Sequence, residues 1–321
     1  VVNYIDYTQN VCIANTEGVF VEDQRIRTRY AISAVAQRDG KMQNGSVNKG
    51  SGLGYELYDQ INVSDMGREA ARIATAMLDA KASPSGKFPV ILDNKFGGVI
   101  FHEACGHGLE ATSVAKGNSV YAGKLGQKIA SDLVTAVDDG TISNEWGSSN
   151  YDDEGTPTQR NTLIENGVLK GYMIDRLNSR RMNMPVTGSS RRQSYKYAPT
   201  SRMTNTYILN GHSKFEDMVA SIEFGLYAKY LGGGSVNPST GEFNFSVQEA
   251  YLIEKGAITS LVKGATLVGT GLDVLDKIEM VSDNFDSGEG MCGSISGSIP
   301  AGLGQPALKV SEITIGGREE A

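Results

Sequence analysis

Residues 97–110 read Gly-Gly-Val-Ile-Phe-His-Glu-Ala-Cys-Gly-His-Gly-Leu-Glu, and the rest of the chain is organised around them. The stretch holds two of the chain's three histidines, His102 and His107, and Glu103 directly follows the first. Imidazole is a common ligand of zinc, and a carboxylate beside a metal-bound water can act as its general base. The stretch therefore indicates the chemistry of a metallohydrolase.

The spacing of the two histidines differs from that of the familiar zinc-protease motif. H-E-x-x-H places its histidines about 40° apart around an α-helix, whereas an interval of five residues separates them by about 140°. A single π-type turn, or a break at Gly106, brings both rings back to one side. We therefore expect a distorted helix between Cys105 and His107, because a regular α-helix would separate the two ligands.

Composition excludes several classes of protein. The chain has 321 residues, of which 40% are hydrophobic and 21% are charged, as in ordinary soluble globular proteins. Its net charge of −7 argues against nucleic-acid binding, and no apolar run is long enough to span a membrane. Three scattered cysteines do not form a disulfide framework, so we expect a cytoplasmic protein.

Sequence patterns predict two domains. Short β-rich runs precede Lys41 to Gly54, which is rich in Gly, Ser and Asn and is expected to be an exposed loop. A helix with an apolar stripe follows, with Asp65 as its N-cap, and Ser-Pro-Ser-Gly at 83–86 ends it. We predict the remainder of an N-terminal α+β domain over residues 1–85 and a β-rich catalytic domain over residues 86–321.

The second half of the chain is predicted to consist mostly of strands. Asn166-Gly167 is a turn that two-residue hairpins favour, and Phe243 to Val247 alternates as a half-buried strand does. Leu308 to Ile315 alternates in the same way at the end of the chain. Before this β-rich region, one helix from Gly97 to Ala115 is expected to carry both motif histidines.

A catalytic zinc ion usually has three protein ligands and one open position, so a third ligand must lie elsewhere. His212 is available in a predicted turn. Cys292 lies among glycines that allow a close approach, and a thiolate is a good zinc ligand. Cys105 is expected to pack inward instead. Chemistry alone favours Cys292 but leaves His212 open.

Two arginines are candidate substrate-binding residues, Arg191 and Arg202. An arginine near a metal can bind a peptide carboxylate or stabilise a developing oxyanion. A solvated basic turn, paired with the many acidic side chains, fits the same pattern equally well. The role of both arginines therefore stays open at this point.

With these residues in place, the chain resembles the TldD/PmbA family of metalloproteases, once described as modulators of DNA gyrase. The H-E-x-x-x-H motif points to the TldD-type subunit, and the family's N-terminal region is expected to be missing. The matching stretches run in family order along almost the whole chain: Phe101–Glu110, Arg202–Thr206, Gly232–Gly234, Gly241–Phe245, Tyr251–Glu254, Lys263–Leu267, Cys292-Gly293 and Pro300–Pro306.

The resemblance implies an α+β fold with extensive antiparallel sheet and a few helices, one of which carries the motif. It implies a zinc-dependent metallopeptidase in which His102, His107 and Cys292 hold Zn²⁺ and Glu103 activates the water. It thereby favours Cys292 over His212. Short or unfolded peptides, bound as an extended strand, are the implied substrates. A PmbA/TldE-type subunit, or a second copy in a homodimer, is the implied partner.

Two other functions stay open. A non-catalytic peptide-binding or regulatory subunit would hold any metal with four protein ligands and no open position. A metal-free regulator of a DNA-processing enzyme would fold without metal. A metal assay, followed by the same assay on Cys292→Ala, distinguishes these functions from the peptidase.

Overall fold

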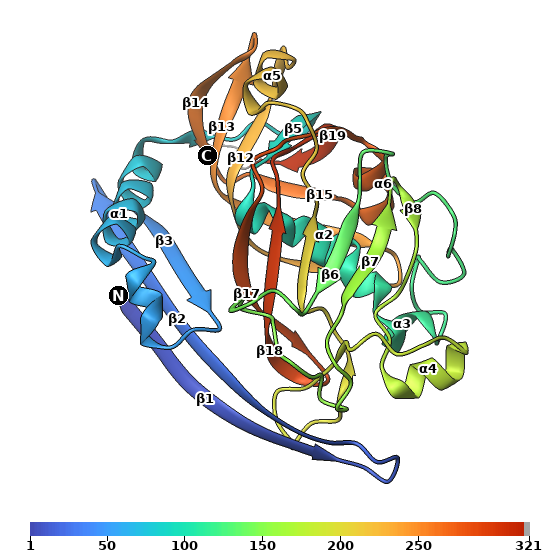
Figure 1. Cartoon of the computed structure of the whole chain (residues 1–321). Helices are drawn as coiled ribbons and strands as arrows, with labels where there is room; N and C mark the ends of the chain where they lie inside the picture. The colour runs from blue at the N-terminus through green and yellow to red at the C-terminus, as the bar shows by residue number, and fades with distance from the viewer. Residues whose placement is uncertain (318–321) are drawn as a thin grey trace.

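The computed structural model describes residues 1–317, which form sheets linked by one long helix and several short ones (Figure 1). Most strand pairs are antiparallel, and the strands form sheets of three, two, six and eight strands. The expected α+β class with extensive antiparallel sheet is therefore confirmed. Within residues 1–317, no helix combines the length and the apolar character that crossing a membrane requires.

The N-terminal part is a three-stranded antiparallel sheet with one long helix packed on it. Figure 1 shows β1 and β2 as a long curved hairpin that extends past β18. Lys41 to Gly54, predicted to be a loop, mostly forms the third strand, so that prediction was wrong. The elements are β1 (Val2–Ala14), β2 (Phe20–Arg38), β3 (Lys41–Ser51), the short 3-10 helix η1 (Tyr55–Asp59) and α1 (Val63–Asp79).

Helix α1 begins earlier than predicted. Its N-cap is Asn62 rather than Asp65, because the Asn62 side chain accepts hydrogen bonds from the backbone N–H groups of Ser64 and Asp65. The apolar stripe faces β2 and β3 as the helical spacing predicts, and its buried members are Ala70, Ile73, Ala74, Met77 and Leu78.

An eight-stranded sheet forms one side of the larger part of the chain. Its order is β12-β5-β19-β15-β13-β14-β4, and β16 pairs with β19 beside this path. The strands are β4 (Lys81–Ala82), β5 (Gly86–Leu92), β12 (Phe224–Val236), β13 (Glu242–Glu254), β14 (Ala257–Lys263), β15 (Thr266–Thr270), β16 (Ile278–Val281) and β19 (Leu308–Gly316).

A six-stranded sheet of order β17-β18-β11-β6-β7-β8 forms the other side. Its strands are β6 (Ala136–Asp139), β7 (Arg160–Glu165), β8 (Val168–Leu169), β11 (Asn205–Ile208), β17 (Asp286–Ser294) and β18 (Gly297–Gln305). The remaining elements are the small pair β9 (Ser190–Arg191) and β10 (Thr200–Ser201) and the helices α4 (Arg176–Met182), α5 (Phe215–Ala220) and α6 (Gly271–Asp276).

The motif segment lies between the two large sheets, and one hydrophobic core joins all three. It is not the single helix from Gly97 to Ala115 that we predicted. It consists of four short pieces, η2 (Lys95–Gly98), α2 (Val99–Ala104), η3 (Gly106–Leu109) and α3 (Ala111–Val114). Cys105 separates α2 from η3 with φ −124° and ψ −51°. The distortion expected between Cys105 and His107 is therefore present.

Close packing at Gly98 holds the start of α2 against β18. A Cβ atom on Gly98 would lie 2.7 Å from the backbone nitrogen of Gly304 and 2.8 Å from its carbonyl oxygen. Backbone atoms cannot move aside as a flexible side chain can, so helix and strand would have to separate. The glycine at this position therefore fixes the distance between the motif segment and the six-stranded sheet.

Gly98→Ala is expected to lower the free energy of unfolding by about 1–3 kcal/mol, the usual effect of overpacking. Gly233→Ala is the matched control, because a Cβ atom there meets nothing within 4 Å. The control should change the free energy of unfolding by at most about 0.5 kcal/mol. Denaturant unfolding measures both variants, and an equal loss in the two would contradict the close packing of Gly98.

Candidate metal centre

Three side chains with metal-ligating atoms converge beneath the β17–β18 hairpin. The Cys292 sulfur lies 3.3 Å from Nε2 of His102 and 3.3 Å from Nε2 of His107. All three donor atoms lie within 4.8 Å of one another, and the two imidazole rings meet at 87°. This is a group of donor atoms close enough to share one metal ion.

The fold brings these residues together from two distant segments. His102 lies on α2 and His107 on η3, and the break at Cys105 turns both rings to one side. Cys292 lies 190 residues after His102, on β17, where it pairs with Ile299 of β18. The cluster therefore forms only when the C-terminal hairpin has folded against the motif segment.

The electrostatics of the cluster favour an ionised thiol. Burial alone would raise the pKa of Cys292, but the charges and hydrogen bonds of His102 and His107 outweigh it and lower the pKa to about 3. Burial would likewise lower the pKa of His107, yet Glu110 and Cys292 hold it well above its usual value. One thiolate and two imidazoles are a donor set that zinc favours. The residues present therefore fit the metal that the motif implies.

Glu110 orients His107 from the side away from the cluster. Its carboxylate Oε1 lies 3.2 Å from Nδ1 of His107, so Nδ1 carries the hydrogen that it donates. Nε2 is then the nitrogen that faces Cys292. Carboxylates that orient metal-binding histidines in this way are a common feature of metal sites.

Arg202 connects Glu110 to the backbone that carries Cys292. Its side chain is fully buried, with Nε 3.7 Å from Oε1 of Glu110. It donates hydrogen bonds of 2.7 Å to the carbonyl oxygen of Cys292 and 2.7 Å to the hydroxyl of Ser296. Because these partners come from the motif segment and from the β17–β18 hairpin, the Arg202 guanidinium group is placed to link the hairpin to the segment that carries the histidines.

Glu103 lies beside the donor atoms and is partly open to solvent. Its Oε2 is 3.6 Å from Nε2 of His107, and 21% of its side chain is exposed. A general base that accepts a proton from water must lie near the reacting group and must be within reach of water. Glu103 is therefore placed where the motif predicts a proton acceptor.

The other residues considered from the sequence lie apart from the cluster. His212 is exposed in the segment between β11 and α5 and does not belong to the group of converging donor atoms. Cys105 is fully buried, as expected. Arg191 is buried, donates to the carbonyl oxygen of Met203 and lines a separate cavity.

Comparison with protein families identifies the class of protein. The family model described as PmbA/TldA metallopeptidase C-terminal domain matches residues 85–317, and the corresponding central-domain model matches residues 1–78. Both describe parts of metallopeptidases. The chain belongs to the PmbA/TldD family.

Individual relatives agree with this assignment. The chain is 46% identical over 316 residues to the metalloprotease TldD homolog of Haemophilus influenzae, covering 96% of this chain and 66% of that protein. The crystal structure of a putative modulator of a DNA gyrase from Thermotoga maritima matches with a TM-score of 0.82 and 26% identity, over 98% of this chain and 68% of the other. TldE from Thermococcus kodakarensis shares the fold, with a TM-score of 0.77 and 22% identity over 96% and 66% of the two chains.

Proposed function

We propose that this chain carries the catalytic centre of a zinc-dependent peptidase. The observation that supports it is the convergence of His102, His107 and Cys292 on one point, with the Glu103 carboxylate beside them. These three residues would hold the ion and leave a fourth position open, as catalytic zinc sites do. Zinc would supply, when bound, polarisation of the scissile carbonyl group and a lowered pKa for water at the open position.

Glu103 would act as general base and then as general acid. Its carboxylate accepts a proton from the attacking water and passes it to the leaving amine, so that one side chain serves both halves of the hydrolysis. Partial exposure leaves the carboxylate accessible to water, whereas His102 and Cys292 are buried. The buried residues would bind the metal and the partly exposed one would move the proton.

The proposed substrates are short or unfolded peptides in an extended conformation. Cys292 lies on β17, the outer strand of the six-stranded sheet. An outer strand offers backbone N–H and C=O groups to an added strand with little regard to its sequence. A peptide bound in this way would pass close to the donor atoms.

A paralogous PmbA/TldE-type subunit is the proposed partner, with a homodimer as the alternative. The support is that a protein named TldE has the same fold as this chain. Mixing the chain with such a subunit should give a heterodimer in size-exclusion chromatography with light scattering. Recovery of two separate species would contradict the heterodimer.

Glu110→Gln is expected to weaken zinc binding about 10-fold, because loss of a group that orients a metal ligand costs about 10- to 100-fold in affinity. Glutamine keeps an acceptor for His107 but removes the negative charge. Chelator competition measures the affinity. Glu312→Gln, at an exposed carboxylate that pairs with Lys277, is the control and should bind zinc unchanged. Equal zinc affinity in Glu110→Gln and the control would show that Glu110 does not position His107.

Removal of zinc tests the proposed function. Chelator-treated chain should lose hydrolysis of a labelled unfolded polypeptide, and one equivalent of zinc per chain should restore it. Without zinc, the scissile carbonyl group would stay unpolarised. Proton transfer by Glu103 alone would then not be enough for hydrolysis. Hydrolysis at the same rate in the chelated and reconstituted chain would exclude a zinc peptidase.

A further inference from the structure

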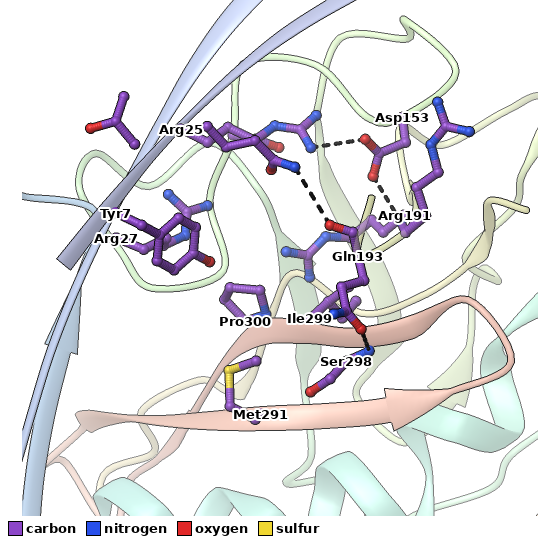
Figure 2. Close-up of a pocket in the computed structure, with 14 residues that line it drawn as sticks. Tyr7, Arg25, Arg27, Asp153, Arg191, Gln193, Met291, Ser298, Ile299 and Pro300 are labelled. Atoms are coloured by element: carbon purple, nitrogen blue, oxygen red, sulfur yellow. Dashed lines mark hydrogen bonds and ion pairs between the residues drawn. The ribbon is translucent and has the colours of Figure 1, made fainter. Parts of the chain in front are cut away.

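A cavity of about 500 Å³ lies between the β1–β2 hairpin and the β17–β18 hairpin (Figure 2). Figure 2 shows Tyr7 and Arg27 on the β1–β2 side and Met291 and Pro300 on the other, with Arg191 completing the wall. Pockets of about 300–1,000 Å³ are typical of sites for small organic ligands. The cavity is therefore large enough for a short peptide segment.

The cavity is distinct from the metal centre. Met291 and Pro300 pair with each other, one position along from the pair of Cys292 and Ile299. Successive side chains of a strand point to opposite faces of the sheet. Met291 and Pro300 therefore face the cavity from the side of the hairpin that lies away from His102 and His107.

Four arginines line this cavity, Arg25, Arg27, Arg191 and Arg192, with Asp153 as the acidic residue in its wall. Arg25 is fully paired, with its guanidinium 2.8 Å from Asp153 and 3.4 Å from Asp23. The cavity is therefore basic although the whole chain carries a net charge of −7.

Arg27 and Arg191 have no carboxylate partner among residues 1–317 within ion-pairing distance. Their side chains are buried, with exposures of 5% and 7%. Arg27 donates to the carbonyl oxygens of Ile26 and Ser148, its Nε has no partner in the described structure, and Arg191 donates to the carbonyl oxygen of Met203. Two guanidinium groups are thus buried beside a cavity with only neutral acceptors.

An unpaired charge is unfavourable in a protein interior, and buried arginines usually face a carboxylate or a phosphate. Burial, reinforced by repulsion from Arg27, lowers the pKa of Arg191 to about 9. Burial also lowers the pKa of Arg27. An anion bound in the cavity, beside both guanidinium groups, would therefore stabilise their charges.

We propose that this cavity binds a carboxylate of a peptide, with an apolar side chain of the same peptide beside it. The Arg27 and Arg191 guanidinium groups supply donors suited to a carboxylate, and Tyr7, Met291 and Pro300 supply the apolar wall. The volume far exceeds that of an inorganic anion. The carboxylate is either the C-terminus of the peptide or an acidic side chain. The arginines and the apolar wall belong to the cavity alone, and the choice of a peptide as the ligand rests on the proposed function.

Isothermal titration calorimetry of the chain carrying Glu103→Gln, with chelator present, tests the site without cleavage. The probes are acetyl-Ala-Ala-Ala-Leu with a free carboxylate, its C-terminal amide, and acetyl-Ala-Glu-Ala-Leu amide. A peptide with a carboxylate should bind at least about 10-fold more tightly than the uncharged amide, since hydrogen bonds to charged groups contribute enough for that difference. Tight binding of the glutamate amide identifies an acidic side chain, and tight binding of the free acid alone identifies the C-terminus.

Variants assign the binding to this cavity. Arg27→Gln and Arg191→Gln should each weaken binding of the tightest peptide at least about 10-fold. Met291→Glu changes a half-exposed position and should have the same effect, because its carboxylate competes for the arginines; it tests the site if the buried variants fail to fold. Arg38→Gln, an exposed arginine on β2, is the control. Any one of three results would overturn the proposal. All three peptides bind equally, phosphate binds as tightly as the tightest peptide, or Met291→Glu leaves the affinity for that peptide unchanged.

Discussion

Replacing Glu103 with glutamine is expected to lower the rate of peptide hydrolysis by about 10²- to 10⁴-fold, the usual contribution of a general acid–base group. Glutamine has nearly the same size as glutamate, so the neighbouring His107 and Cys292 keep their positions. It cannot accept the proton of the attacking water. Initial rates with a labelled unfolded polypeptide measure the loss, and elemental analysis should still find one zinc per chain.

Glu165→Gln is the control for this experiment, because Glu165 is an exposed carboxylate that pairs with Lys170 and does not belong to the metal-ligating group. It should hydrolyse the polypeptide at the unaltered rate. Loss of zinc together with activity in Glu103→Gln would make Glu103 a structural residue. Activity retained with full zinc would show that another group moves the proton.

Replacing Cys292 with alanine is expected to weaken zinc binding by more than about 100-fold, since loss of a group that merely orients a ligand already costs about 10- to 100-fold. The thiolate is the one donor of the cluster that comes from outside the motif segment, and only two imidazoles remain without it. Hydrolysis should disappear with the zinc. Chelator competition and the hydrolysis assay measure the two effects.

Cys12→Ala is the matched control, because Cys12 is an exposed cysteine on β1. It should keep both zinc and activity. Undiminished zinc affinity in Cys292→Ala would assign the third ligand to another residue, or would show that two histidines suffice.

Local sequence patterns predicted the elements whose structure depends mainly on their own residues. The apolar stripe of α1 and the distortion between Cys105 and His107 follow from spacing along the chain. The segment from Lys41 to Gly54 shows the limit, because its Gly, Ser and Asn residues suggest a loop although Lys41–Ser51 is β3. Small residues serve there to let a helix approach the strand, since a Cβ atom on Gly45 would lie 2.3 Å from the carbonyl oxygen of Ala70.

The residue chemistry alone predicted the types of ligand in the metal cluster, and only the family resemblance selected Cys292 over His212 for the third position. Nothing near Cys292 or His212 in sequence shows which of them meets the motif, because the answer depends on the register of the β17–β18 hairpin. Burial of Arg202 behind Cys292 likewise arises from tertiary packing that local composition does not encode. Glu110 was missed although its spacing of three residues from His107 is visible in the motif.

X-ray absorption at the zinc edge tests the three-ligand centre most directly. Purified chain loaded with zinc should contain one ion, bound by one sulfur atom and two imidazole nitrogen atoms, with the remaining position taken by a light atom from solvent. Those ligands correspond to Cys292, His102 and His107 in the structure. A zinc ion without a sulfur neighbour, or a fully folded chain that binds no zinc, would contradict this centre.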